Sequence, residues 1–441
     1  MMNLCKKEGR RPAFFKNKPF QEPRSRGGGV SKLAFFLLFS LIFILNGCND
    51  GKKSGTAESS GCMEKLREVS APLVIDENCA GERVVLIRSV VGRDTLEKFF
   101  VLRDSVARAV AKPLPPGLSQ AMVLSYPVGK VAVLSSAQIG FMIRLGLEDR
   151  IVAVGSRKYI ADSVLYGRVV EGRVAELIPD GMEVDYERLM ALKPDLVMTY
   201  ATGGSQDDYD RMEKLGLPAM LTSEWQADSP LAKARWIRLF GALFGVEPAA
   251  DSIDSANASA YGALACSPVR GSLATESASL PKDDCPRVLA GISYGGTWYA
   301  PGGKSYTANL IKDAGGCYLW ASDTTREIRL SIEDVMALAD SADLWINPGM
   351  YGTPEDILTA EPRAAYIKAF RNKKVFQYDG RKGPEGGNDF FEGAVARPAE
   401  VLRNLQDQWG FTAESLPCLI SDQPKKPVFA DSSFNWYHNI F

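Results

Sequence analysis

Two stretches of the chain share one pattern and decide the fold. Residues 185–198 read DYERLMALKPDLVM, and residues 331–346 read SIEDVMALADSADLWI. Each contains a short helix with a glutamate in its first turn, Glu187 in one and Glu333 in the other. The helix dipole favours an acid at this position. Each stretch then continues with Asp-Leu and an apolar strand. Either helix alone is also typical of an ordinary amphipathic segment with a solvated acid. The repeat predicts two related α/β lobes with one exposed glutamate at the equivalent position of each.

Short apolar runs alternate with helical segments from residue 130 onward. The runs with strand character include residues 131–134, 151–154, 196–200, 219–222 and 287–292. Strands of this kind, when helices separate them, form parallel sheets that are covered on both faces. We therefore expect an N-terminal α/β lobe over residues 129–228 and a C-terminal α/β lobe over residues 286–441.

The segment between the lobes, residues 229–264, carries no strand signal. Ser229 is a good helix cap, Pro230 suits the first helical position, and only Pro248 is expected to bend or break the helix. The fold class is therefore α/β, with two lobes on parallel sheets joined by one long helix. Residues 62–128 precede the lobes, and their apolar runs predict an N-terminal extension with a β-hairpin.

The start of the chain predicts export. A basic segment is followed by the apolar run Leu33–Leu45, which is too short to span a bilayer but suits a signal-peptide core. The run ends in Asn46-Gly47-Cys48, which resembles a bacterial lipoprotein box. We expect a signal peptide over residues 1–47, a lipid on Cys48, and a flexible Gly- and Ser-rich tether over residues 48–61.

Cysteine and histidine usage limits the chemistry. An exported chain can form disulfides, and Cys266 and Cys285 are a candidate pair because they bracket a polar, Ser-rich insertion over residues 265–285. Six cysteines permit about 15 pairings, so other pairings stay open. The chain has no Cys-x-x-Cys motif and one histidine, His438, so we expect neither a zinc site nor a resident cofactor. The formal net charge of −1 does not indicate nucleic acid as a partner.

Several motifs over roughly residues 129–412 resemble the substrate-binding lipoproteins of bacterial ABC importers for vitamin B12, iron–siderophore or haem. The resemblance lies in Val133–Ser136, Glu187–Leu189 with Leu192–Val197, Pro301–Ser305 through Asp313–Gly316, and Gly386–Asp389. It implies a fold like that of class III periplasmic binding proteins. It also implies that Glu187 and Glu333 dock on arginines of the ABC permease, which suits carboxylate–guanidinium pairing.

The resemblance places the ligand between the lobes, at loops that leave the carboxyl ends of the strands. Aromatic side chains there suit a macrocycle or an aromatic chelate, and cations suit an anionic ligand, although any one aromatic could simply be packed in the core. With a single histidine a His-ligated haem iron is disfavoured, although tyrosine could serve. The candidate ligand-binding residues are Arg157, Lys158, Tyr159, Tyr200, Trp225, Tyr294, Trp298 and Tyr299.

Two alternatives stay open. An enzyme would have only His438 for a Ser-His or Cys-His pair, and the P-loop-like Gly303-Lys304-Ser305 lacks its first glycine because Trp298 stands there. A surface lipoprotein that senses or scavenges a ligand would not need both docking glutamates. We expect a monomeric, non-enzymatic lipoprotein of the periplasm or cell envelope, held to the membrane by its lipid alone, that carries an iron chelate, haem or cobalamin to a permease.

Overall fold

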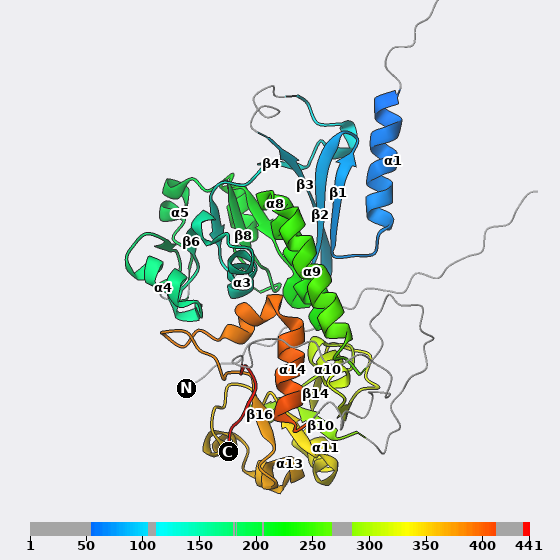
Figure 1. The fold of residues 1–441 in the computed structure, drawn as a ribbon, viewed down its shortest axis with the longest axis vertical. Coiled ribbons are helices and arrows are strands. Elements are labelled where there is room, and N and C mark those ends of the chain that lie inside the picture. Colours follow the sequence, from blue (N-terminus) through cyan, green and yellow to red (C-terminus); the bar gives the residue numbers. More distant parts are fainter. Residues whose placement is uncertain are drawn as a thin grey trace, which may run out of the picture. The chain divides into compact units, whose positions relative to one another are not determined.

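The computed structural model describes residues 54–104, 112–179, 181, 183–204, 207–266, 285–411 and 435–441. The predicted signal peptide, Cys48 and most of the polar insertion lie outside these residues. Figure 1 shows the described elements, which begin with helix α1. No helix within the described residues is long and apolar enough to cross a membrane.

The N-terminal extension is a four-stranded sheet with a helix. Helix α1 covers Ser54–Glu68, so the flexible tether predicted for residues 48–61 is wrong from Ser54 onward. Met63 and Leu66 of this helix are buried in the same cluster as side chains of the sheet, and a disulfide joins Cys62 to Cys79, which holds the segment in place. The strands pair in the order β1-β2-β3-β4, antiparallel except for the parallel pair β3–β4, and are β1 (Leu73–Cys79), β2 (Glu82–Val91), β3 (Asp94–Arg103) and β4 (Met122–Ser125).

The N-terminal lobe contains a fully parallel sheet in the order β7-β6-β5-β8-β9. Its strands are short and almost entirely buried, as the apolar runs predict. The strand order reverses beside β5, and in such sheets the loops at the carboxyl ends there form a crevice. The elements are β5 (Val131–Val133), α3 (Ser136–Arg144), β6 (Ile151–Val154), α4 (Ser163–Val170), β7 (Ala175–Glu176), α5 (Tyr186–Leu192), β8 (Leu196–Thr199), α6 (Tyr209–Lys214) and β9 (Ala219–Leu221).

Three helices connect the lobes, and the single long helix predicted for residues 229–264 is wrong. They are α7 (Pro230–Ala234), α8 (Ile237–Phe244) and α9 (Glu247–Gly262). Ser229 caps α7 as expected, since its side chain accepts from the amide of Ala232. Helix α8 ends because Gly245 adopts the left-handed conformation, with φ of 73°, that commonly terminates helices. Helix α9 then restarts with Pro248 in its first turn.

The C-terminal lobe also has a mostly parallel sheet, in the order β13-β10-β15-β16-β17, of which only β17 runs antiparallel. A separate antiparallel sheet, β11-β12-β14, follows β10. The elements are β10 (Arg287–Ala290), β11 (Ile292–Tyr294), β12 (Thr297–Pro301), α10 (Tyr306–Asp313), β13 (Cys317–Tyr318), β14 (Glu327–Leu330), α11 (Ile332–Met336), β15 (Leu344–Ile346), α12 (Pro354–Ala360), α13 (Lys368–Arg371), β16 (Val375–Gln377), α14 (Pro398–Gln408) and β17 (His438–Asn439).

The predicted disulfide between Cys266 and Cys285 is wrong. Cys285 bonds to Cys317, because the parallel pairing of β10 with β13 places Arg287 opposite Cys317 and so brings Cys285 to the same edge. Cys266 is also disulfide-bonded, though not to Cys285. The bonds Cys62–Cys79 and Cys285–Cys317 span 17 and 32 residues. On the chain-entropy model each stabilises the fold by roughly 3–4 kcal/mol.

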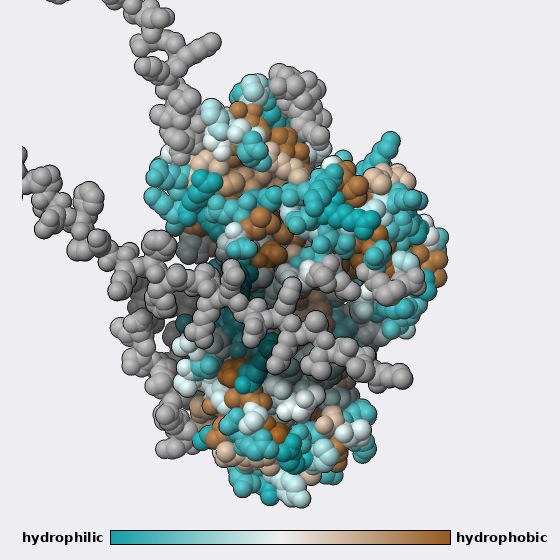
Figure 2. All heavy atoms as spheres, turned by 180° about the vertical axis from the view of Figure 1, so that it is seen from behind, coloured by the Kyte–Doolittle hydropathy of each residue, from teal (hydrophilic) through white to brown (hydrophobic). Residues whose placement is uncertain are grey.

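Hydrophobic packing joins the extension to the N-terminal lobe. Val85, Ile87 and Phe100 of the extension belong to the same buried cluster as Phe141 of α3 and Phe240 of α8. Side chains of the extension's sheet are therefore part of the hydrophobic core of the N-terminal lobe. On the face seen in Figure 2 hydrophilic residues predominate, and the apolar ones form small separate patches.

Candidate functional site

A cavity of about 370 Å³ opens at the carboxyl ends of the N-terminal sheet. Its walls come from the loops after β5, β6, β8 and β9, from α7, and from Phe391 of the segment that follows β16. The cavity therefore lies at the point of the sheet where the strand order reverses, as such folds predict. Its chemistry comes mainly from Ser135, Ser136, Tyr159, Tyr200, Thr202, Glu224, Trp225, Lys233 and Phe391.

The buried amide of Gln138 fixes the loops around this cavity. Its Oε1 accepts from the amides of Leu134 and Ser135, at 3.0 and 3.2 Å. Its Nε2 donates to the carbonyl of Thr199, at 3.2 Å, and to the hydroxyl of Thr222, at 3.0 Å. A single side chain thus joins the ends of β5, β8 and β9. A fully satisfied buried network of this kind holds the loops in one arrangement.

Three of the predicted aromatic residues lie together on the cavity wall. Tyr159, Tyr200 and Trp225 line the cavity, and 63%, 45% and 44% of their surfaces stay exposed. Phe391 adds a fourth aromatic side chain, which the sequence reasoning missed. Exposed aromatic faces around a concave site can stack on a flat ligand and become buried when it binds.

A buried acid beside a lysine also lines the cavity, and the sequence reasoning missed both. Glu224 is only 2% exposed, and its Oε2 has no hydrogen-bond partner among the described residues. Burial raises the pKa of Glu224, while the hydroxyl of Thr222 opposes that rise. Burial likewise lowers the pKa of Lys233, and the nearby Glu224 opposes that change. A hydrogen-bond donor of a ligand placed against Glu224 would satisfy this buried carboxyl oxygen.

The predicted aromatic residues of the C-terminal lobe do not line this cavity. Trp298 is 1% exposed, its ring lies 5.4 Å from that of Trp345, and its Nε1 donates to the carbonyl of Ala290. Its prediction as a ligand-binding residue is wrong, because β11 and β12 form a hairpin that turns this ring into the core. Tyr294 is 72% exposed beside the hairpin turn, and Tyr299 packs under the guanidinium of Arg329.

The two predicted cations lie close to the cavity but outside its wall. Arg157 pairs with Glu176 and, from the other lobe, with Glu385 at 3.1 Å. Those carboxylates raise the pKa of Arg157. Lys158 is exposed, and its side chain forms no ion pair within the described residues. Arg157 therefore joins the lobes, while Lys158 is available to an anionic group at the rim.

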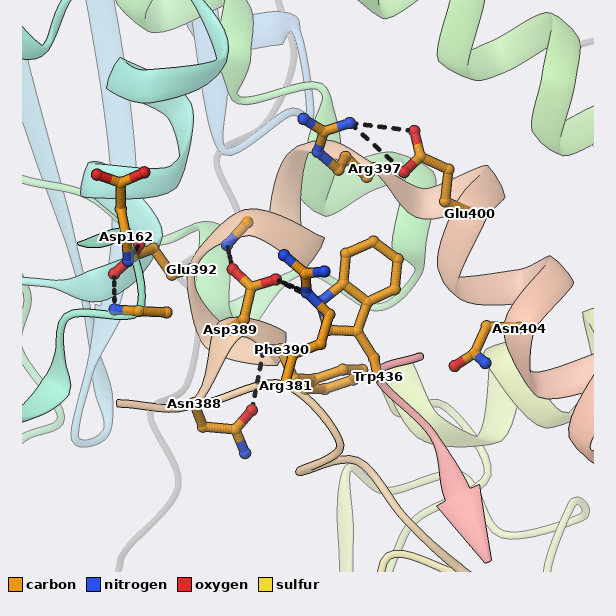
Figure 3. A network of polar contacts seen from close by, with 12 residues as sticks. Asp162, Arg381, Asn388, Asp389, Phe390, Glu392, Arg397, Glu400, Asn404 and Trp436 are labelled. Atoms are coloured by element: carbon orange, nitrogen blue, oxygen red, sulfur yellow. Dashed lines mark hydrogen bonds and ion pairs between the residues drawn. The ribbon is translucent and has the colours of Figure 1, made fainter. Parts of the chain in front are cut away.

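A buried carboxyl group forms a second connection between the lobes (Figure 3). Glu392, which follows β16, accepts from the amides of Ala161 and Asp162, at 2.8 and 2.7 Å. Burial raises the pKa of Glu392 to about 8 despite these two bonds. Nearby, Asp389 accepts from the indole of Trp436 at 2.8 Å. These contacts hold Phe391 against the cavity.

Comparison with known proteins identifies the family. A family model described as periplasmic binding protein matches residues 131–381, more than half of the chain. The chain is a periplasmic binding protein. The match confirms the resemblance noted in the sequence, and it confirms that the α/β lobes belong to a solute-binding protein rather than to an enzyme.

Individual relatives of this periplasmic binding protein are distant. An uncharacterized lipoprotein of Methanocaldococcus jannaschii is 20% identical over 299 residues, which are 64% of this chain and 65% of that one. A structure of an ABC-type Fe3+-hydroxamate transport system from Saccharomonospora viridis is 19% identical, with 65% and 94% coverage and a TM-score of 0.46. A periplasmic haem-binding protein of Vibrio cholerae is 17% identical, with 63% and 98% coverage and a TM-score of 0.46. The family assignment rests on the match over residues 131–381.

The two glutamates of the repeat are both exposed in this binding protein, but their surroundings differ. Glu187, in the first turn of α5, has no hydrogen bond or ion pair within the described residues. Glu333, in the first turn of α11, pairs with Arg363 at 2.9 Å, and Arg363 also binds the buried Glu361. The pair Glu333–Arg363 is largely solvent-exposed, so breaking it costs little free energy.

Proposed function

We propose that this periplasmic binding protein is the substrate-binding lipoprotein of an ABC importer. It captures an iron chelate, haem or cobalamin in the cavity of the N-terminal lobe and delivers it to an inner-membrane permease. The observation that carries the proposal is the group of exposed aromatic residues at the carboxyl ends of the sheet, which Phe391 completes from the segment after β16. A flat, largely apolar chelate or macrocycle fits this lining.

The polar groups of the cavity narrow the ligand further. Glu224 and Lys233 place a buried carboxyl group and an amino group at the wall, and the exposed Lys158 supplies positive charge at the rim. A ligand with hydrogen-bond donors at one edge would match the carboxyl group of Glu224, and an anionic or metal-chelating group at another edge would match the positive charge. The tyrosines Tyr159 and Tyr200 are the only phenols at the cavity wall within the described part of the chain.

The ligand is tested by purification followed by titration. The absorbance spectrum and mass of any co-purified compound separate corrinoid, haem and ferric chelate by colour and size. The protein is then titrated with haemin, cyanocobalamin and ferrioxamine B while tryptophan fluorescence is followed. We expect saturable binding of one of these probes. Binding of none of them, together with no co-purified compound, would reject the proposed ligand class.

The lipid anchor is tested separately. Residues 33–48 have the order expected of a lipoprotein signal, so we expect the mature chain to begin at a diacylglyceryl-modified Cys48. Intact-mass measurement of the membrane fraction checks this, and Cys48→Ser should release the protein from membranes. An unprocessed chain, or cleavage at another residue, would reject the anchor.

One observation favours the alternative of a sensing or scavenging lipoprotein. Glu333 already has a partner, Arg363, whereas a docking residue should be free to meet a permease. The exposure of this pair makes the exchange of partners inexpensive in free energy. Delivery to a permease therefore stands as the proposal, and uptake measurements on the two glutamates decide between the alternatives.

A further inference from the structure

The β2–β3 hairpin of the N-terminal extension lies outside the residues that match the family. The hairpin nevertheless contacts the loop that carries the cavity residues Glu224 and Trp225. That loop, residues 223–226, follows β9 and places Glu224 and Trp225 on the wall. The hydroxyl of Ser223 donates to the carbonyl of Arg88 on β2, at 3.0 Å. The loop thus begins at a hydrogen bond to the extension.

The loop also ends at the extension, through the side chain of Gln226. Its Oε1 accepts from the amide of Val90 at 3.0 Å, and its Nε2 donates to the carbonyl of Val90 at 2.6 Å. The amide group therefore satisfies both backbone groups of one strand residue, as a neighbouring strand would. From the other lobe Arg326 donates to the backbone carbonyl of Gln226.

The tip of the same hairpin touches a second loop of the cavity. Gly203 adopts a φ of +83°, and a Cβ there would lie 2.5 Å from the amide nitrogen of Gly92 at the tip. Only glycine permits this approach of the two backbones. The loop that contains Gly203 also provides Tyr200 and Thr202 to the wall. The hairpin consequently contacts two of the four strand-end loops around the cavity.

We propose that the β2–β3 hairpin is a positioning element of the ligand site, which acts through Gln226 and Ser223 to set Glu224 and Trp225. This inference rests on the proposed function only in taking the cavity as the ligand site. The hairpin determines which edge of the ligand meets Glu224 and which face meets Trp225. The extension thereby contributes to specificity through residues that never touch the ligand.

The test separates positioning from simple stabilisation. Gln226→Leu keeps the approximate volume and removes both hydrogen bonds to Val90. Gln120→Leu is the matched control, since Gln120 is exposed elsewhere in the extension and forms no hydrogen bond within the described residues. Trp225 is followed without ligand by subtracting the fluorescence of the same variant with Trp225→Phe. We expect Gln226→Leu to increase acrylamide quenching of Trp225 and Gln120→Leu to leave it unchanged.

Affinity provides the second readout, with whichever of haemin, cyanocobalamin and ferrioxamine B binds the native protein. Gln226→Leu should weaken binding on the order of tenfold, because a mobile loop loses part of the stacking and the contact to Glu224. In a Trp225→Ala background the same substitution should have a clearly smaller effect, since positioning acts through Trp225.

The outcomes are distinct. Unchanged affinity and unchanged Trp225 quenching in Gln226→Leu would overturn the proposal. It would also be overturned if the unfolding stability falls while affinity and quenching stay native, or if the losses from Gln226→Leu and Trp225→Ala are additive. If no probe binds the native protein, the proposed ligand class fails, and the quenching of Trp225 still decides whether the hairpin sets the loop.

Discussion

The two lobes arise from one repeated helix–strand pattern, but only in the N-terminal lobe do the loops that follow the strands of the parallel sheet place aromatic residues at the cavity, to which Phe391 adds a ring from the segment after β16. After β8 and β9 the chain forms short loops, and these leave Tyr200 and Trp225 exposed at the cavity. After β10 the chain instead forms the sheet β11-β12-β14, whose hairpin buries Trp298. The comparison shows that a shared topology fixes where loops begin, while the local pairing of each loop decides which side chains a ligand can reach.

The largest effect that distinguishes the lobes is expected at Trp298. Trp298→Ala removes a fully buried ring that contacts Trp345, so the free energy of unfolding should fall by about 3–5 kcal/mol. Chemical denaturation of the variant and the native protein measures this loss. A loss under about 1 kcal/mol would contradict the core position and restore Trp298 as a candidate ligand contact.

The second prediction concerns the two repeat glutamates. Glu187→Ala should reduce uptake strongly with little change in ligand affinity or stability, because losing one partner of a desolvated interfacial pair costs roughly 2–5 kcal/mol. Glu333→Ala should have a weaker effect, since Glu333 must first leave Arg363. Charge reversal to arginine should be worse than alanine at both sites. Transport and binding are measured in the same variants, and normal import by the double variant would exclude docking.

The third prediction concerns Glu392, whose buried carboxyl group holds the segment after β16 on the N-terminal lobe. The pKa of Glu392 is about 8 in the folded protein, above its value in the unfolded chain. Protonated Glu392 therefore stabilises the folded protein fully below about pH 4.5, and this contribution is lost as the pH rises through about 8. Unfolding free energies should fall by up to a few kcal/mol over this range. Glu392→Gln should flatten this dependence, and an equally steep curve in that variant would assign it to other groups.

The smallest effect belongs to the C-terminal lobe, at β17. His438 binds Asp379 at 2.7 Å, and this bond raises the pKa of His438 and helps to lower that of Asp379 to about 2. The contribution of His438 is present below about pH 6.5 and is lost as the pH rises through its folded pKa. The pair is partly exposed, so it contributes under about 1 kcal/mol. His438 is the only histidine, so its NMR signal can be followed directly. The pKa from this titration should lie above about 6.5 in the native protein and fall back towards about 6.5 in Asp379→Asn.

The sequence predicts features that depend on local pattern. Apolar strands, the cap at Ser229 and the exposed position of Glu187 follow from period, dipole and capping chemistry. Features that depend on chain pairing do not follow. Cys317 meets Cys285 because β13 pairs with β10, and the loop that contains Glu224 is held between the extension and the C-terminal lobe by hydrogen bonds of Gln226. Gly245 ends α8, and an isolated glycine within a helical run gives only a weak signal of that end.

The most direct test of a ligand site in the N-terminal lobe is the affinity of Trp225→Ala beside that of Tyr294→Ala. Both side chains are exposed aromatics, but only Trp225 lines the cavity. With the probe that binds the native protein, Trp225→Ala should lose about 1–3 kcal/mol of binding free energy while Tyr294→Ala stays native. Equal affinities in the two variants, or a loss confined to Tyr294→Ala, would contradict a ligand site in the N-terminal lobe.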